Sequence, residues 1–250
     1  MPGKSSVPPR AALLVGVLLG LGLALSSARA ASVAPDPGDP ALPAAERLPA
    51  LFARVREQQL QLRSLDAQFI QKKESSMLAA PEEARGQFSY QAPDKVRWEY
   101  LTPKAMTVLV LGEQMTTWYR DLKRADRVNV GKYSGQVLRY LGASGSLETL
   151  AQYFDTTLVQ PKDAAEPFRL DLVPRYARIA KKIKAMTLWI DRQRYLPLHL
   201  RYLEADGDST DYVFVNLRLN PDLPAARFTL ELPPDVTVRT IELGQGRSEQ

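Results

Sequence analysis

The sequence predicts an α+β protein that is mainly β, with one large antiparallel sheet, an N-terminal helix and a helical insertion. Three patterns in the 250 residues support this. Many short segments alternate apolar and polar residues, which is the period of a half-buried strand. Residues 45–62 have apolar side chains at helical spacing, and a second helical stretch between Tyr133 and Phe154 interrupts the strands. No repeat or internal linker separates these parts, so we expect one domain over residues 45–243 and a disordered tail at 244–250.

The first thirty residues have the pattern of a secretory signal peptide. Lys4 and Arg10 precede an apolar run, and Ala28-Arg29-Ala30 supplies small residues at the two positions that signal peptidase recognises. We therefore expect cleavage after Ala30, followed by a flexible leader at 31–44 that is rich in Pro, Asp and Ala. The alternative is an uncleaved membrane anchor, because the apolar run is nearly long enough to span a bilayer.

Charge and cysteine content exclude several classes of protein. The chain has 33 Lys and Arg against 28 Asp and Glu, and three of the basic residues lie in the signal, so the exported chain has a net charge of only +2. Nucleic-acid binding is not indicated. Cys is absent, which excludes thiol catalysis, disulfides, thiolate metal sites and lipid attachment to an N-terminal Cys. We expect a monomer in the periplasm of a Gram-negative bacterium.

The segment between Gly86 and Pro103 has the clearest strand pattern. Val96, Trp98 and Tyr100 point one way, and the charged residues between them point the other. Phe88 and Tyr90 repeat the pattern on the preceding run. This predicts two strands that share an unusually aromatic face.

Other elements follow from similar patterns. A strand with Leu65, Ala67 and Phe69 follows the helix, and residues 79–85 form a polar turn region. Residues 106–111, which include Met106 and Val108, have apolar side chains on both faces of the expected strand, as in a strand that is covered on both sides. A turn at Gly112 leads to a strand at 115–120 that carries Trp118. Later strands are expected around Phe168, Leu170 and Leu172; Met186, Leu188 and Ile190; Leu198, Leu200 and Tyr202; Val213, Val215 and Leu217; and Phe228, Leu230 and Leu232. Asp206-Gly207 predicts a hairpin between two of them.

The helical insertion is predicted as two short helices around a Gly-Ser hinge at 142–146. The apolar residues of the helices recur at steps of three and four: Leu138 and Leu141 in the first, and Leu147, Leu150 and Phe154 in the second.

Few residues are arranged for catalysis or metal binding. The single histidine, His199, is expected to be exposed on a polar strand face, and no nucleophile motif accompanies it. One His and no Cys leave only carboxylates for zinc. The acidic residues between Asp206 and Asp211 resemble a calcium loop but lack the closing Glu, so a turn is the better interpretation. We expect no enzyme activity, cofactor or metal; a hydrolase with paired carboxylates has no supporting spacing.

Two features allow a functional and a structural interpretation. The basic cluster of Arg175, Arg178, Lys181, Lys182 and Lys184 is either a solvated loop or a docking patch for an acidic partner or anionic headgroups. The aromatic residues on neighbouring strands form either an ordinary core or the lining of a cavity.

The chain resembles the periplasmic outer membrane lipoprotein carrier family, LolA. The matching positions run in order over nearly the whole domain: SLDAQFIQ at 64–71, Gly86 and Phe88, Pro93, Arg97, Trp98, Tyr100 and Pro103, Asp206-Gly207, Asn220, Phe228, and LPPDV at 232–236 with Val238. The resemblance implies an incomplete antiparallel barrel, a half-barrel whose apolar concave face is covered by short helices that act as a lid. It also implies a cargo of lipoprotein acyl chains, received from an inner-membrane ABC release complex and passed to an outer-membrane acceptor.

One position departs from the family pattern. Members from enteric bacteria have an Arg that takes part in lid closure directly before the Pro that corresponds to Pro93. Here the residue is Ala92. Either another polar group, such as Arg97, holds the lid, or closure is looser.

Under this interpretation, the expected acyl-chain cavity is lined by Phe88, Tyr90, Val96, Trp98, Tyr100, Met106, Val108 and Trp118. The expected lid and its contacts are Arg97, Leu138, Leu141, Leu147, Leu150 and Phe154. Two rivals stay open: a lipid-sensing regulatory domain like those that restrain an envelope-stress anti-sigma factor, and a carrier of a different lipid or glycolipid. Sequence cannot separate the cargoes, because apolar burial is non-directional.

Overall fold

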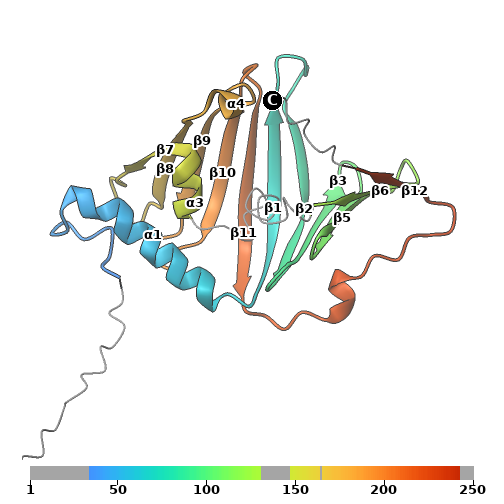
Figure 1. Cartoon of the computed structure of the whole chain (residues 1–250), viewed down its shortest axis with the longest axis horizontal. Coiled ribbons are helices and arrows are strands. Elements are labelled where there is room, and N and C mark those ends of the chain that lie inside the picture. Colours follow the sequence, from blue (N-terminus) through green and yellow to red (C-terminus); the bar gives the residue numbers. More distant parts are fainter. Residues whose placement is uncertain (1–33, 131–146, 164, 243–250) are drawn as a thin grey trace, which may run out of the picture. The chain divides into compact units, whose positions relative to one another are not determined.

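The computed structural model describes residues 34–130, 147–163 and 165–242, all within one compact unit, Val33–Gln250. These residues form a single sheet with a few short helices (Figure 1). The helices are α1 (Ala44–Gln61), α3 (Leu147–Tyr153), α4 (Ala177–Ala180) and the 3-10 helix η2 (Ala225–Phe228). Within this part of the chain, no helix is both long and apolar enough to cross a membrane. The expected signal peptide, the first insertion helix and the tail at 244–250 lie outside the described residues.

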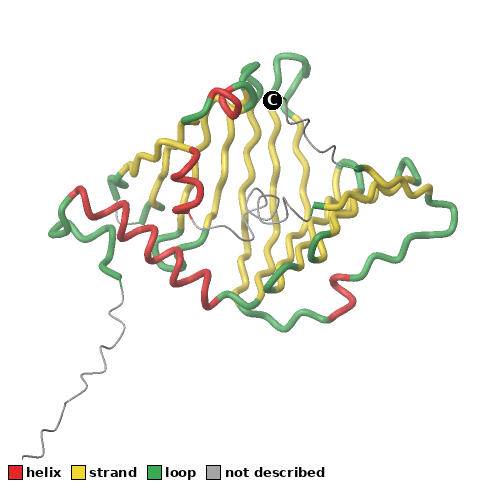
Figure 2. The backbone as a smooth tube through the Cα atoms, viewed as in Figure 1, coloured by secondary structure: helices red, strands yellow, loops and turns green. Residues whose placement is uncertain are grey.

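The sheet has twelve strands in the order β12-β6-β5-β4-β3-β2-β1-β11-β10-β9-β8-β7. Their bounds are β1 Ser64–Glu74, β2 Glu82–Gln91, β3 Lys95–Thr102, β4 Met106–Leu111, β5 Gln114–Tyr119, β6 Arg124–Asn129, β7 Phe154–Val159, β8 Phe168–Pro174, β9 Ile183–Ile190, β10 Pro197–Glu204, β11 Ser209–Leu219 and β12 Thr237–Ile241. All neighbours are antiparallel except β6 and β12, which are parallel. Because β7 and β12 are the two edges and do not pair, the sheet is open (Figure 2). The predicted mainly β, half-barrel class is confirmed.

One face of this sheet is apolar across its strands, and we call it the inner face. The register places Trp98 opposite Phe88 on β2 and Val108 on β4. The same pairing continues through β1, β11, β10, β9 and β8, so that alternate residues of every strand share this face. The opposite, outer face has most of the polar residues, among them Asp66, Arg97 and Glu99.

The inner face is concave where the aromatic residues lie. Strands β3 and β11 are separated by β2 and β1, which in a flat sheet would place them about 14 Å apart. Nevertheless the rings of Trp98 on β3 and Phe214 on β11 have centroids only 5.6 Å apart. Side chains from distant strands converge in this way when a sheet curves toward them.

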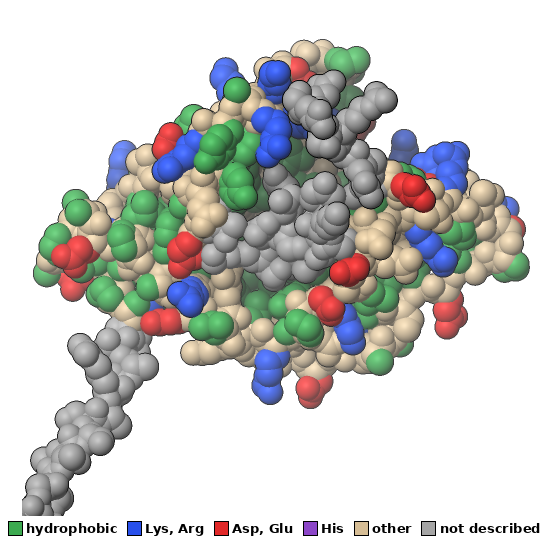
Figure 3. Space-filling view, in the orientation of Figure 1, with side chains coloured by type: hydrophobic (Ala, Val, Ile, Leu, Met, Phe, Trp, Pro, Cys, Tyr) green, Lys and Arg blue, Asp and Glu red, His purple; other side chains and the backbone are tan. Residues whose placement is uncertain are grey.

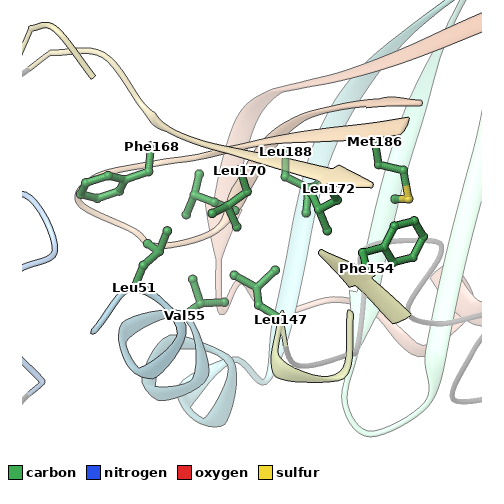
Figure 4. Packing of buried hydrophobic residues seen from close by; sticks show 10 residues of the cluster. Leu51, Val55, Leu147, Phe154, Phe168, Leu170, Leu172, Met186 and Leu188 are labelled. Atoms are coloured by element: carbon green, nitrogen blue, oxygen red, sulfur yellow. The ribbon is translucent and has the colours of Figure 1, made fainter. Parts of the chain in front are cut away.

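Helices α1 and α3 cover the inner face at the β7–β9 end. Leu51 and Val55 of α1 and Leu147 of α3 point toward leucines on β8 and β9 (Figure 4). The buried residues of this helix-covered cluster are Leu51, Val55, Leu147, Phe154, Phe168, Leu170, Leu172, Met186, Leu188 and Ile190. The apolar spacing that predicted a helix over 45–62 therefore reflects the burial of one face of α1 against the sheet.

Several sequence expectations about the bounds and types of elements are wrong. The strand expected around Phe228, Leu230 and Leu232 is instead η2 followed by an extended segment outside the sheet. Phe154 begins strand β7 and does not extend the α3 helix. The turn region expected at 79–85 is shorter on its C-terminal side, because β2 begins at Glu82. Strands β6, β7 and β12 were not predicted, since their apolar residues are too few for a clear alternation.

Residues 34–43, the described part of the expected leader, pack against the domain. The backbone N–H of Ala34 donates to Glu57 on α1 at 3.0 Å, and Arg47 donates to the carbonyl of Leu42 at 2.9 Å. This portion forms turns that are bonded to α1.

Strand β11 changes its alternation at a β-bulge. Asn216 has a positive φ of 55°, and the register with β1 shifts between Asp66 and Gln68. Before the bulge Tyr212 and Phe214 belong to the inner face; after it Leu217 and Leu219 do. The sequence prediction placed Val213 and Val215 on the apolar face with Leu217. A strict alternation does not allow for the extra residue that a bulge inserts.

We predict that Gly86→Ala is destabilising because β2 has no room for a side chain at this position. An added Cβ would lie 2.1 Å from the backbone oxygen of Glu99 and 2.6 Å from the Phe69 ring. The free energy of unfolding should fall by about 1–3 kcal/mol, as for other overpacked sites, measured by urea denaturation. Gly38→Ala is the control, since its Cβ meets only the flexible end of Arg192 and the side chain of Asp36. Equal effects of the two substitutions would contradict the prediction.

Candidate functional site

The inner face between β11 and β4 holds the aromatic residues that the sequence singled out. Phe88, Tyr90, Val96 and Trp98 are buried there, with 0% exposure of Val96 and 4% of Trp98. Tyr100, Met106 and Val108 share the face but are only partly buried. Seven of the eight residues predicted to line a cavity are thus on one surface.

The rings of this surface pack against one another mainly edge to face. Trp98 is central: its ring centroid lies 4.7 Å from Phe69, 4.9 Å from Phe88 and 5.5 Å from Tyr212. Phe69 also contacts Tyr100 at 4.9 Å. Such pairs add about 0.5–1.5 kcal/mol each beyond area burial. We call this set, formed by Phe69, Phe88, Trp98, Tyr100, Tyr212 and Phe214, the aromatic cluster.

Three tyrosine hydroxyls give the cluster a polar edge. The hydroxyl of Tyr212 lies near those of Tyr100 and Tyr202. Burial, together with these two neighbours, raises the pKa of Tyr212 above its ordinary value. Burial likewise raises the pKa of Tyr100. Tyr100 and Tyr212 therefore stay neutral at physiological pH, and this edge has hydroxyl groups in place of charges.

Trp98 also has a polar atom without a partner. Within the described part of the chain, its buried indole N–H has no hydrogen-bond acceptor. A buried donor without an acceptor costs free energy. The aromatic cluster therefore contains a donor that a ligand oxygen would satisfy.

Trp118 is the predicted cavity residue that the structure places elsewhere. In the β4–β5 register it lies opposite Thr107, whereas Thr117 lies opposite inner-face Val108. Trp118 is therefore on the outer face, where the guanidinium of Arg120 lies 4.9 Å from its ring centroid. The next residue, Tyr119, lies opposite inner-face Met106 and is therefore on the inner face. The sequence prediction of Trp118 as the cavity residue of this strand was wrong.

Arg97 is also on the outer face and does not contact the described helices α1 or α3. Its Nη1 donates to the carbonyls of Arg227 and Thr229 at 3.3 and 3.0 Å, and its Nη2 lies 3.2 Å from Glu99. Arg97 therefore binds the C-terminal segment to β3. This is a correction to its expected role as a lid contact.

Glu99 has two cationic partners on this face. Arg120 Nη2 is 3.0 Å from its Oε1, in addition to the contact with Arg97. Burial alone would raise the pKa of Glu99, but hydrogen bonds and charge from Arg97 and Arg120 outweigh burial and lower it.

The expected lid is only partly described. Leu138 and Leu141 lie outside the described residues. Leu147 is buried against β8 and β9, and Leu150 is half-buried beside it. Phe154 packs in the same cluster, although from strand β7.

The other candidates for chemistry have structural partners. His199 Nε2 lies 2.6 Å from Asp211, and its ring stacks on Trp189 at 3.9 Å, so it is less exposed than expected. Asp206-Gly207 forms the predicted hairpin, with Gly207 at φ +98°. Across residues 34–130, 147–163 and 165–242, no group of three or more His, Cys, Asp or Glu side chains could hold a metal ion.

Sequence reasoning missed some inner-face residues. Tyr212 and Phe214 were assigned to the wrong side of β11 because of the bulge at Asn216. Phe69 was identified only as a strand residue, although it touches both Trp98 and Tyr100. Its nearness to them depends on Gly86, whose missing side chain leaves room for the Phe69 ring. A glycine in a strand beside an aromatic pair is a signal that could have revealed this contact.

Known proteins match the part of the chain that contains strands β1 to β11. The family model described as outer membrane lipoprotein carrier protein LolA matches residues 60–231. A similar protein from Alkalilimnicola ehrlichii, named outer-membrane lipoprotein carrier protein, is 27% identical over 189 residues, covering 74% of this chain and 80% of the relative. One of the same name from Pseudomonas fluorescens is 24% identical over 157 residues, covering 63% and 72%.

A solved structure supports the fold. The crystal structure of an uncharacterised conserved protein from Thermus thermophilus has a TM-score of 0.50 and 15% sequence identity. The match covers 78% of this chain and 99% of that one. At this identity the likeness concerns architecture alone.

We predict that Arg97→Gln loosens the C-terminal segment. The substitution removes the ion pair with Glu99 and the bonds to the carbonyls of Arg227 and Thr229, so the free energy of unfolding should fall by about 1–3 kcal/mol. Hydrogen exchange should also increase at residues 225–236. Arg85→Gln is the control, because its pair with Glu83 is exposed and such changes stay within about 0.5 kcal/mol. Unchanged exchange in Arg97→Gln would contradict the assignment.

We also predict that the contribution of Glu99 depends on pH. Because its pKa in the folded protein is below the ordinary value of 4.5, the charged form stabilises the fold above that value. The stabilisation is lost as pH falls through the lowered pKa. The stability difference between wild type and Glu99→Gln should therefore be constant near neutral pH and shrink in acid, as measured by urea denaturation across pH. A difference that does not change with pH would contradict this.

Proposed function

Because the chain belongs to the LolA family of outer membrane lipoprotein carriers, we propose that it shields lipoprotein acyl chains on its inner face during transfer from the inner to the outer membrane. The observation that carries the proposal is the continuous, uncharged, concave surface around Trp98. Such a surface fits an alkyl chain, which offers area and no directional contacts. The polar outer face keeps the loaded protein in water.

The size of the apolar free energy explains why transfer needs a carrier. Burying one CH₂ is worth about 0.8 kcal/mol, so a chain of ~16 carbons resists water by on the order of 10 kcal/mol. Several chains on one lipoprotein would hold it in the membrane. A carrier that offers an equivalent apolar surface removes most of this barrier.

The half-buried end of the inner face is the proposed entry for cargo. Met106 and Val108 on β4 and Met115 on β5 lie next to the buried cluster and are partly accessible. Met adapts to irregular apolar shapes. An alkyl chain that enters over these residues would reach Trp98, whose unpaired indole N–H can donate to the carbonyl of an acyl ester.

The remaining parts of the proposal rest on the N-terminal sequence pattern and on what the family resemblance implies. The chain is exported by the N-terminal signal, works as a monomer in the periplasm, receives cargo from an inner-membrane ABC release complex and gives it to an outer-membrane acceptor. The α3 segment with Leu147 and Leu150 is one wall of the lid. With Ala92 before Pro93, that lid has no Arg at this position. We do not propose that Arg97 replaces that Arg in the lid, because Arg97 binds the C-terminal segment on the outer face.

We predict that an added charge at the entry abolishes cargo binding. Met106→Asp and Val108→Asp place a carboxylate on the apolar path but at half-exposed positions, so the fold should be retained. Val96 and Trp98 are unsuitable for this test, since a charge at either would be buried and would itself unfold the protein. Protein purified from the periplasm should lose at least about tenfold in bound lipoprotein, by mass spectrometry of co-purifying molecules.

Leu111→Asp is the matched control. It lies on the same strand but on the outer face, and it is exposed, so it should keep wild-type cargo. Normal lipoprotein recovery from Met106→Asp and Val108→Asp would refute the inner-face site. Recovery of a different lipid class from the wild type would support the rival assignment as a carrier of another lipid.

A further inference from the structure

Three chain connections lie together at one end of the sheet. They are residues 75–81 between β1 and β2, residues 175–182 between β8 and β9, which include α4, and residues 205–208 between β10 and β11. The backbone N–H of Ala205 donates to the carbonyl of Lys182 at 3.1 Å. At the end of β1, just before the 75–81 connection, Lys73 lies 3.9 Å from Asp208 and Glu74 pairs with Ser209. These contacts make the three connections one surface, which we call the α4 end (top of Figure 1).

The α4 end has the basic cluster that the proposed carrier function does not use. Four of its residues are exposed and form no ion pair within the described residues: Arg178, Lys181, Lys182 and Lys184. By contrast, Arg175 is paired with Asp155 at 2.9 Å. The acids at this end are Glu82, Glu204, Asp206 and Asp208, and Asp208 is already paired with Lys73, so three acids without an ion pair among the described residues stand against the four cations. A net positive charge therefore remains on this surface.

Exposed apolar side chains accompany these cations. The 75–81 connection contains no charged residue, and Met77 at its tip is 92% exposed. Tyr176 and Val173, next to α4, are 54% and 55% exposed. Figure 3 shows Lys and Arg side chains near apolar ones in the upper part of the view.

We propose that the α4 end is a contact surface for an anionic phospholipid bilayer. Cations contribute attraction to anionic headgroups, and neighbouring apolar side chains enter the interface between headgroups and acyl chains. The two parts occur side by side here: Met77, Tyr176 and Lys181 lie on the connections, and Val173 and Lys184 lie at the adjoining ends of β8 and β9. The contact would bring the carrier to the membrane at which a lipidated molecule enters or leaves it.

A bilayer fits this surface better than an acidic protein does. An acidic partner would use the cations but would give no reason for a nearly fully exposed Met77 on an uncharged loop. Exposed Met and Tyr beside cations are what a peripheral membrane contact requires. The inference does not depend on the proposed cargo, because binding to lipid can be measured without any lipoprotein.

The test uses protein recovered from the periplasm and vesicles of phosphatidylcholine with or without phosphatidylglycerol. Co-sedimentation should detect binding to the anionic vesicles, and added salt should weaken it. Lys181→Glu with Lys182→Glu should weaken binding at least about tenfold, and Met77→Asp by about fivefold. The charge control is Arg63→Glu with Lys162→Glu, and the apolar control is Leu60→Asp; these exposed residues are at the opposite end of the sheet and should bind as wild type does.

Three results would overturn the inference. One is absence of wild-type binding to anionic vesicles, and another is an equal loss in the control variants. The third is binding to polyglutamate but not to vesicles, which would assign the cations to an acidic protein partner. Because lipoprotein recovery is measured separately, failure here leaves the inner-face proposal standing.

Discussion

The packing of Phe69 against Trp98 over Gly86 is the contact on which the inner face depends. It joins β1 to β3 across an intervening strand, and only a glycine on β2 leaves room for the Phe69 ring. With this contact in place, Tyr100, Tyr212 and Phe214 converge on the same point from strands that are far apart in the sheet. The curvature that makes the face concave and the aromatic surface that fills it therefore have one cause.

The two halves of the inner face are shielded from solvent in different ways. At the β7–β9 end, aliphatic residues are buried under α1 and α3 in an ordinary helix-on-sheet core. Between β11 and β4, aromatic rings cover one another, and their polar atoms are hydroxyls or an unpaired indole N–H. In the first half, α3 packs as the fixed wall of the proposed lid. The second can exchange its ring contacts for contacts with a ligand, because each ring pair is weak on its own.

Much of this arrangement could be predicted from local pattern. The alternation of Val96, Trp98 and Tyr100 identified the strand and its apolar face, and the helical spacing of apolar residues over 45–62 identified α1. What failed involved long-range geometry. The bulge at Asn216 reversed the faces of β11. On β5 the predicted Trp118 faces outward, and the adjacent Tyr119 faces inward. Arg97 was misassigned because its two carbonyl partners are 130 and 132 residues away in the sequence, a distance that no local pattern can indicate.

The energetics of the aromatic cluster suit a carrier that must also release its cargo. Six ring contacts join the cluster, and at about 0.5–1.5 kcal/mol each they sum to several kcal/mol. One acyl chain gains on the order of 10 kcal/mol by leaving water. A chain that enters must displace part of the cluster, so the net affinity is the difference between two comparable terms. A preformed empty cavity would bind more tightly, whereas a face that closes on itself when empty binds more weakly and so favours delivery.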